Sequence, residues 1–122
     1  MFIRFVVGSE DEDHRSLTGI VTEARLLRDR GELEQDQAAW LERTYDWLNE
    51  NLPCPPFSSS SWGPEAISWF KDDAGLPIKK MWEIVVFLRE HGVPVRLLRS
   101  KNPGKILYED DFQIVVREWK QL

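Results

Sequence analysis

Residues 77 to 100 constrain the fold of this chain more than any other stretch, because they indicate an apolar helix that passes directly into a strand. Pro77 suits the first turn of a helix, and Gly92 can adopt the left-handed conformation that ends one. Between them, apolar residues recur at the i, i+3, i+4, i+7 spacing of one helical face, namely Met81, Ile84, Val85 and Leu88. Trp82, Val86 and Phe87 lie outside that face, so we expect this core helix to be covered on more than one side.

The rest of the sequence predicts a single α+β domain over residues 1–122, in the order β-α-α-α(short)-α-β-β-β, with a mainly antiparallel sheet packed on the core helix. The expected elements are a strand at 2–7, helices from about 16 to 30 and about 34 to 52, a short helix at 64–71, the core helix at 77–90, and strands at 93–99, 105–109 and 112–118. The two long helices should form an antiparallel hairpin, and the last three strands a meander. Residues 53–63, rich in proline and serine, predict a surface loop held by Phe57 and Trp62.

Composition favours a cytoplasmic protein that folds without a cofactor. A chain of 122 residues can bury a sufficient core, and the single Cys54 has no second cysteine to pair with. The apolar runs are too short for a signal peptide or a membrane span, so we expect no membrane partner.

The net charge of −5 argues against general nucleic-acid binding, but the charge is unevenly distributed. Residues 79–105 hold 7 basic and 2 acidic residues, which is +5. If the strand after the core helix folds back along it, basic side chains gather near the helix start, where the helix dipole is positive. The predicted anion-binding group is Lys79, Lys80, Arg99, Lys101 and Lys105, and the alternative is a solvated basic rim.

Acidic residues at 10–13 and 109–111 offer a second possibility. If the first strand runs antiparallel to the strand at 93–99, both groups reach one end of the sheet together with His14 and His91, and they could hold a hard divalent metal. Asp11, Asp13, Asp110 and Asp111 would then be the first residues to test. If it runs parallel, the acidic loop instead neutralises the basic turn. The spacing matches no EF-hand or zinc pattern, so turn chemistry and a solvated loop are the plainer interpretation, and no metal site is predicted.

The predicted sheet has apolar residues on both faces. Leu98, Leu107, Val115 and Trp119 fall on the face opposite the core helix. Either the helical hairpin or a second chain should cover them, which makes these residues a candidate interface and predicts a buried Trp119.

The stretches AISWFK and NPGKILYEDDFQIVV, with the layout of the rest, resemble a group of short bacterial proteins of no known activity. A histidine often occupies the position of Phe112 in that group, so no polar role is transferred to this residue. The resemblance implies no activity.

Function is therefore predicted from the residues alone. The serines at 58–61 have no histidine near them in sequence and no Gly-x-Ser-x-Gly turn, and no other catalytic residues can be assigned. A non-enzymatic binding or interaction protein, with a protein partner or a second copy, is the first expectation. The alternatives are a small metal-dependent hydrolase or nuclease, and a nucleotide or nucleic-acid binder that uses the basic end.

Overall fold

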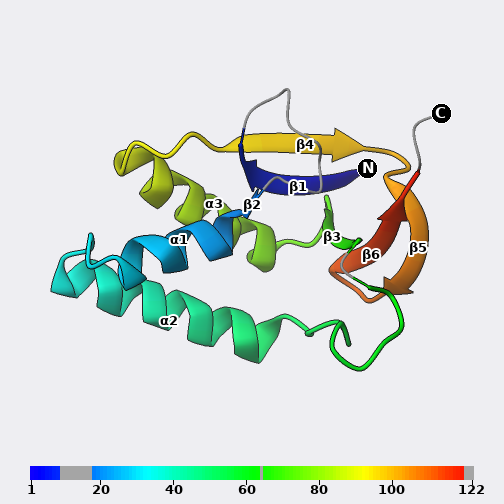
Figure 1. The fold of residues 1–122 in the computed structure, drawn as a ribbon, viewed down its shortest axis with the longest axis horizontal. Helices are drawn as coiled ribbons and strands as arrows, with labels where there is room; N and C mark the ends of the chain where they lie inside the picture. Colours follow the sequence, from blue (N-terminus) through cyan, green and yellow to red (C-terminus); the bar gives the residue numbers. More distant parts are fainter. Residues whose placement is uncertain (9–17, 64, 120–122) are drawn as a thin grey trace.

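The computed structural model describes residues 1–8, 18–63 and 65–119 of the chain (Figure 1). Its helices and strands confirm the α+β class. In chain order they are β1 (Phe2–Val7), β2 (Thr18–Gly19), α1 (Ile20–Asp29), α2 (Gln35–Asn51), β3 (Ala66–Lys71), α3 (Leu76–Glu90), β4 (Arg96–Ser100), β5 (Gly104–Glu109) and β6 (Gln113–Glu118). The strands form one sheet in which every recorded pairing is antiparallel. No helix in the described part of the chain has the length and apolar character needed to cross a membrane.

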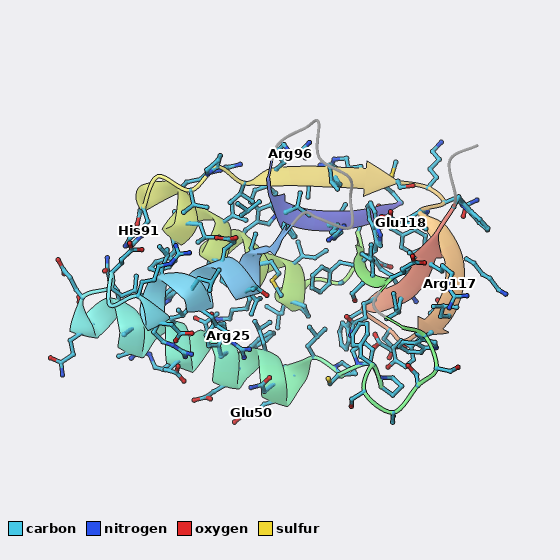
Figure 2. All side chains as sticks on the ribbon, in the orientation of Figure 1. Arg25, Glu50, His91, Arg96, Arg117 and Glu118 are labelled. Carbon is cyan, nitrogen blue, oxygen red and sulfur yellow. The ribbon has the colours of Figure 1, made fainter. Side chains whose placement is uncertain are left out.

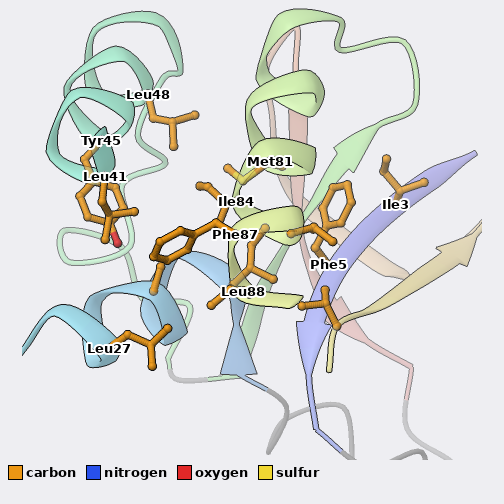
Figure 3. Packing of buried hydrophobic residues seen from close by; sticks show 14 residues of the cluster. Ile3, Phe5, Leu27, Leu41, Tyr45, Leu48, Met81, Ile84, Phe87 and Leu88 are labelled. Carbon is orange, nitrogen blue, oxygen red and sulfur yellow. The ribbon is translucent and has the colours of Figure 1, made fainter. Parts of the chain in front are cut away.

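Helix α3 forms where the sequence predicts it and lies at the centre of the main core (Figure 3). Proline stands in its first turn, and Gly92 beyond its end has a φ of 75°. Its principal apolar face, which includes Ile84 and Leu88, is completely buried. Phe87 is also buried and packs against Trp40 of α2, with ring centroids 5.2 Å apart. The expectation that α3 is covered on more than one side is therefore confirmed for the side that carries Phe87.

Helices α1 and α2 form the predicted antiparallel hairpin (Figure 1). The chain reverses at Gly31, which has a φ of 72°, and the Glu34 and Gln37 side chains form a reciprocal capping box at the start of α2. The Tyr45 hydroxyl donates to the carbonyl of Val21 across the pair, at 3.1 Å. The hairpin packs on α3 and contributes to the same core as the helix-facing side of β1. Helix α1 begins at Ile20, and the start predicted at about residue 16 lies outside the described residues.

The prediction of a short helix at 64–71 is wrong, because AISWFK forms strand β3, which lies between β1 and β6 in the sheet. Its side chains alternate with the period of a strand. Trp69 packs with Ile114 and Val116 in a second apolar cluster, whereas Phe70 packs on the main core from the opposite face. Six residues rich in aromatic and β-branched side chains fit a pleated strand better than an isolated helical turn.

The prediction of a C-terminal meander is also wrong, because β4 pairs with β1 and not with β5. The strand order is β4-β1-β3-β6-β5, so residues 101–103 connect the two edges of the sheet. The four residue steps from Ser100 to Gly104 span at most about 14 Å. Four strand spacings in a flat sheet would separate those edges by about 19 Å. The sheet must therefore be strongly coiled, and Figure 1 shows β5 and β6 running across the direction of β1 and β4.

Coiling explains how the second sheet face is covered. Leu98 of β4 packs in the same apolar cluster as Trp69 of β3 and Val116 of β6, although β1 separates β4 from β3, and both β1 and β3 separate β4 from β6 in the sheet order. The sheet therefore closes its second face largely on itself, and the helical hairpin packs elsewhere.

The loop at 53–63 packs on the β5–β6 end of the sheet. Trp62 contacts Tyr108 of β5 with ring centroids 6.1 Å apart, and Phe57 packs edge-on against Trp62 at 5.6 Å. The buried amide of Gln113 donates to the carbonyl of Pro53 at 2.7 Å. Trp62 thus contacts the sheet, whereas Phe57, which is 43% exposed, packs on Trp62 within the loop.

Candidate interaction surface

The four residues predicted as an interface do not form one exposed surface. Val115 is completely buried, and Leu98 and Leu107 are half-buried. Trp119 is 57% exposed, and its indole N–H donates to the carbonyl of Asn102 at 3.2 Å. The prediction that Trp119 is buried within the chain is wrong, because the hairpin packs on α3 and the turn after β4 contacts only the edge of the indole.

Lysines 79 and 80 lie in the first half of α3. The ammonium group of Lys80 pairs with Glu83 at 3.6 Å and lies 5.4 Å from the ring centre of Trp47, which belongs to α2. Lys80 therefore points toward the helical hairpin. Lys79 is exposed.

The other three predicted anion-binding residues lie on or beside the edge strands. Arg99 pairs with Ile3 in the β4–β1 ladder, Lys101 follows β4, and Lys105 of β5 pairs with Arg117. No recorded contact among the described residues joins Lys80 to this group, so the five-residue anion site stays a prediction.

The acidic corner at 109–111 lies near the start of β1. Lys71 pairs with Phe2 in the ladder, and its ammonium group contacts the carboxylate of Glu109 at 2.6 Å. The end of β1 lies near the start of β4, where the Arg96 side chain donates to the carbonyl of Gly8 at 3.3 Å. The direction that the sequence left open is thus antiparallel to β4. Residues 10–13 and His14 lie outside the described residues.

His91 does not share an end of the sheet with the acidic corner, so the expectation that an antiparallel first strand would bring the two together is wrong. His91 follows α3, and its Nδ1 lies 2.9 Å from the carbonyl of Phe87 (Figure 2). The acidic corner lies away from His91 because β6, which forms the corner with β5, pairs with β3 and not with β4. No group of three or more His, Cys, Asp or Glu in residues 1–8, 18–63 and 65–119 is arranged to hold a metal ion.

Asp110 stabilises the corner itself. Its carboxylate accepts hydrogen bonds from the backbone N–H groups of Phe112 at 2.8 Å and Gln113 at 3.0 Å, from the Tyr108 hydroxyl at 2.9 Å, and from the Gln113 amide at 3.1 Å. Partial burial raises the pKa of Asp110, but the hydrogen bonds from Phe112, Tyr108 and Gln113 outweigh it, and the net shift lowers this pKa. The carboxylate thus acts as the acceptor that closes the β5–β6 turn.

A different surface, formed by α3 and β4, exposes apolar side chains. Trp82 is 39% exposed and Val86 is 53% exposed, one helical turn apart. The Trp82 ring meets the Phe5 ring edge-on, with centroids 5.2 Å apart. Because Phe5 pairs with Leu97 of β4, Trp82 lies over the β1–β4 pair. We call this region the α3–β4 surface; it comprises Lys79, Trp82, Val86 and Arg89 of α3 and Leu97 and Arg99 of β4.

The α3–β4 surface is basic. Lys79 precedes Trp82 by three residues and Arg89 follows Val86 by three, so both cations lie on the same side of the helix as the apolar pair. Arg89 also donates to the carbonyl of Val95 at 3.3 Å, just before β4. Arg99 lies two residues beyond Leu97 and therefore on the same face of the strand. Glu83 and Glu90 lie on the same side of α3, three residues before and four after Val86, and Glu83 pairs with Lys80. The three exposed cations therefore leave this surface a small positive excess, in a chain whose net charge is −5.

Strand β4 adds an open edge to this surface. Within the part of the chain that the structure describes, β4 pairs only with β1. An edge strand of this kind offers backbone N–H and C=O groups to another extended segment. Apolar side chains, cations and an unpaired strand edge are therefore found together on one side of α3.

No protein family model, curated protein or solved structure matches this chain, so the interpretation of the surface rests on its own residues.

Proposed function

We propose that this protein is a non-enzymatic binding protein that holds an acidic, extended segment of a partner protein on the α3–β4 surface. The observation that supports this most strongly is the exposure of Trp82 and Val86 beside an edge of β4 that has no strand partner among the described residues. A segment added to that edge would form main-chain hydrogen bonds with β4, and alternate side chains would contact the apolar pair.

The positive charges of the α3–β4 surface favour a partner segment that is acidic. Carboxylates on the added strand would pair with Lys79, Arg89 and Arg99, and such pairs contribute more to specificity and association rate than to affinity. Pro94 and the positive charges at the β4 edge also disfavour pairing with a second basic or neutral strand. The same side chains thus oppose indiscriminate strand pairing and favour an acidic partner. Tryptophan is enriched among residues that dominate binding energy, which supports a central role for Trp82.

The test uses a fluorescein-labelled peptide of ten residues with alternating valine and glutamate, and a matched peptide with lysine in place of glutamate. Fluorescence anisotropy should show saturable binding of the glutamate peptide, weakened by added salt, and no binding of the lysine peptide. Val86→Lys should weaken binding at least ten-fold, and so should Arg99→Glu. Ile106→Lys is the matched control, because Ile106 is 49% exposed on β5, the other edge strand.

Equal binding of the two peptides would contradict the proposal, and so would equal effects of Val86→Lys and Ile106→Lys. Light scattering provides a second decisive result. If the protein is a dimer whose mass falls to that of a monomer on Val86→Lys, the occupant of the surface is a second copy of this chain, and the proposal of an acidic partner segment is refuted.

A further inference from the structure

Strand β1 has a gap along one of its edges. Strand β4 pairs with β1 from Phe2 to Val6, so β2 and β3 must both lie on the other edge. On that edge β3 pairs at Phe2 and Ile3, and β2 pairs at Val6 and Val7. Between these two short pairings, the ladder along that edge is interrupted in the part of the chain that the structure describes. The sheet is therefore split between β1 and β3.

A cavity of about 380 Å³ lies at this split. Its volume is within the range of about 300–1,000 Å³ that is typical of small-molecule sites. Most of its wall is apolar and comes from Phe5, Ile20, Val21, Ile67, Phe70 and Met81. This wall combines residues from both faces of the sheet, since Phe70 packs on the main core and Ile67 on the second cluster. The cavity is therefore lined by residues of both sheet faces at the point where β1 and β3 separate.

Among the described residues, three polar side chains line the cavity, those of Arg4, Thr22 and Ser68, and only that of Arg4 is charged. The Ser68 hydroxyl donates to the buried Gln113 amide oxygen at 3.0 Å, so it is already engaged. Arg4 lines the cavity from the face of β1 opposite to Phe5. Partial burial lowers the pKa of Arg4 more than the nearby Glu118 raises it, so the net shift of this pKa is downward. A guanidinium carries five N–H donors in a planar fork, so Arg4 can contact an acidic neighbour and a ligand carboxylate together.

We infer that this cavity binds a small organic monocarboxylate whose apolar body contacts Phe5, Phe70 and Met81 and whose carboxylate pairs with Arg4. A predominantly apolar wall with one cation favours a ligand that has one charged end. The inference depends on the split in the sheet and is independent of the α3–β4 surface.

Gly19 provides a way to fill the cavity without straining the backbone. It lines the cavity with φ −70° and ψ 152°, which any residue can adopt, and a Cβ atom placed there meets nothing within 4 Å. Gly19→Leu should therefore fill part of the space, and Gly19→Ala should leave most of it open.

The experiment is a ¹H–¹⁵N NMR titration of the full chain with octanoate, and with octanol as the uncharged analogue. Octanoate should shift the amide resonances of residues 19–22 and 66–68 and bind at least ten-fold more tightly than octanol. Gly19→Leu should weaken octanoate binding at least ten-fold, whereas Gly19→Ala should change it less than three-fold. Arg4→Gln should remove the preference for octanoate over octanol, and Arg4→Lys should retain part of it.

Shifts confined to the α3–β4 surface would overturn the inference, and so would the absence of any shift at millimolar octanoate. Octanoate affinity unchanged by Gly19→Leu in a variant that melts like the parent protein would also overturn it. If the Arg4 variants do not fold, the comparison of Gly19→Leu with Gly19→Ala and of octanoate with octanol still decides the result.

Discussion

Replacing Asp110 with alanine tests whether the acidic corner is structural. The carboxylate accepts four hydrogen bonds, two from backbone N–H groups and two from the side chains of Tyr108 and Gln113. A hydrogen bond to a charged group contributes about 1.5–3 kcal/mol net when it is buried, but Asp110 is only half-buried, so water can replace most of what is lost. We therefore expect Asp110→Ala to reduce the free energy of unfolding by about 2 kcal/mol. For a domain of this size, that is a fall in Tm of about 8 °C.

Circular dichroism melts with and without 5 mM Mg²⁺ or Mn²⁺ measure this effect. Asp111→Ala is the matched control, because Asp111 is an exposed carboxylate in the same turn. It should change the free energy of unfolding by less than about 0.5 kcal/mol. The metal ions should raise the Tm of neither the parent protein nor the variants. Equal destabilisation by the two substitutions, or a metal-dependent Tm that needs both carboxylates, would refute the structural role and support the hydrolase alternative.

The pH dependence of stability gives a check on the same carboxylate. The pKa of Asp110 in the folded protein is lower than its ordinary value of 3.8, so its contribution is fully present above that value. It is lost as the pH falls through the lowered folded pKa. Asp110→Asn should therefore flatten the acid limb of the stability profile below about pH 4. An unchanged acid limb would show that the hydrogen bonds do not favour the ionised form.

Three further substitutions test the packing by thermal or denaturant unfolding. Gly104→Ala should cost about 1–3 kcal/mol, because its Cβ would lie 2.3 Å from the carbonyl oxygen of Arg117; a neutral effect would mean that β5 and β6 do not approach so closely. Leu88→Ala, at a completely buried position, should cost about 2–5 kcal/mol, whereas Val86→Ala should cost less than about 0.5 kcal/mol; similar losses would contradict the assigned faces of α3. Trp119→Ala should cost less than about 1.5 kcal/mol, because one hydrogen bond is lost from an exposed indole; a loss of about 3 kcal/mol or more would indicate a covered ring.

The helices could be predicted from the sequence because their signals are local. Pro77 and Gly92 mark the two ends of α3 in the sequence, and the structure adds a signal of the same local kind, the Glu34–Gln37 capping box at the start of α2. Each signal acts within one or two helical turns, so no knowledge of distant contacts is needed.

The strand partners could not be predicted in the same way. The six residues of β3 are ambiguous by themselves, and their strand conformation depends on β6, whose Val115 pairs with Ser68 from 47 positions away (115 − 68). The turn at Asn102 reads as a simple hairpin, yet β4 pairs with β1 at the other end of the chain. A local turn signal predicts that the chain reverses its direction, but it does not predict which strand the next segment pairs with.

Prediction of the candidate surface failed for a related reason. The sequence identifies Trp82 and Val86 as apolar residues outside the main face of the core helix. Whether they are covered depends on the side of α3 on which the hairpin packs, and the Phe87 side is the one that it occupies. The useful signal is an apolar helix with more apolar sides than its neighbours in the chain can cover.

Amide hydrogen exchange on β4 is the most direct test of the proposed function. Uniformly labelled protein is measured with and without a saturating amount of the valine–glutamate peptide, and exchange is followed for residues 96–100. Addition of a strand predicts that alternate amides in this segment, those that face away from β1, become protected at least ten-fold, while the amides of β5 exchange at unchanged rates. Peptide binding that leaves every β4 amide unprotected, or that protects β5 instead, would contradict the account.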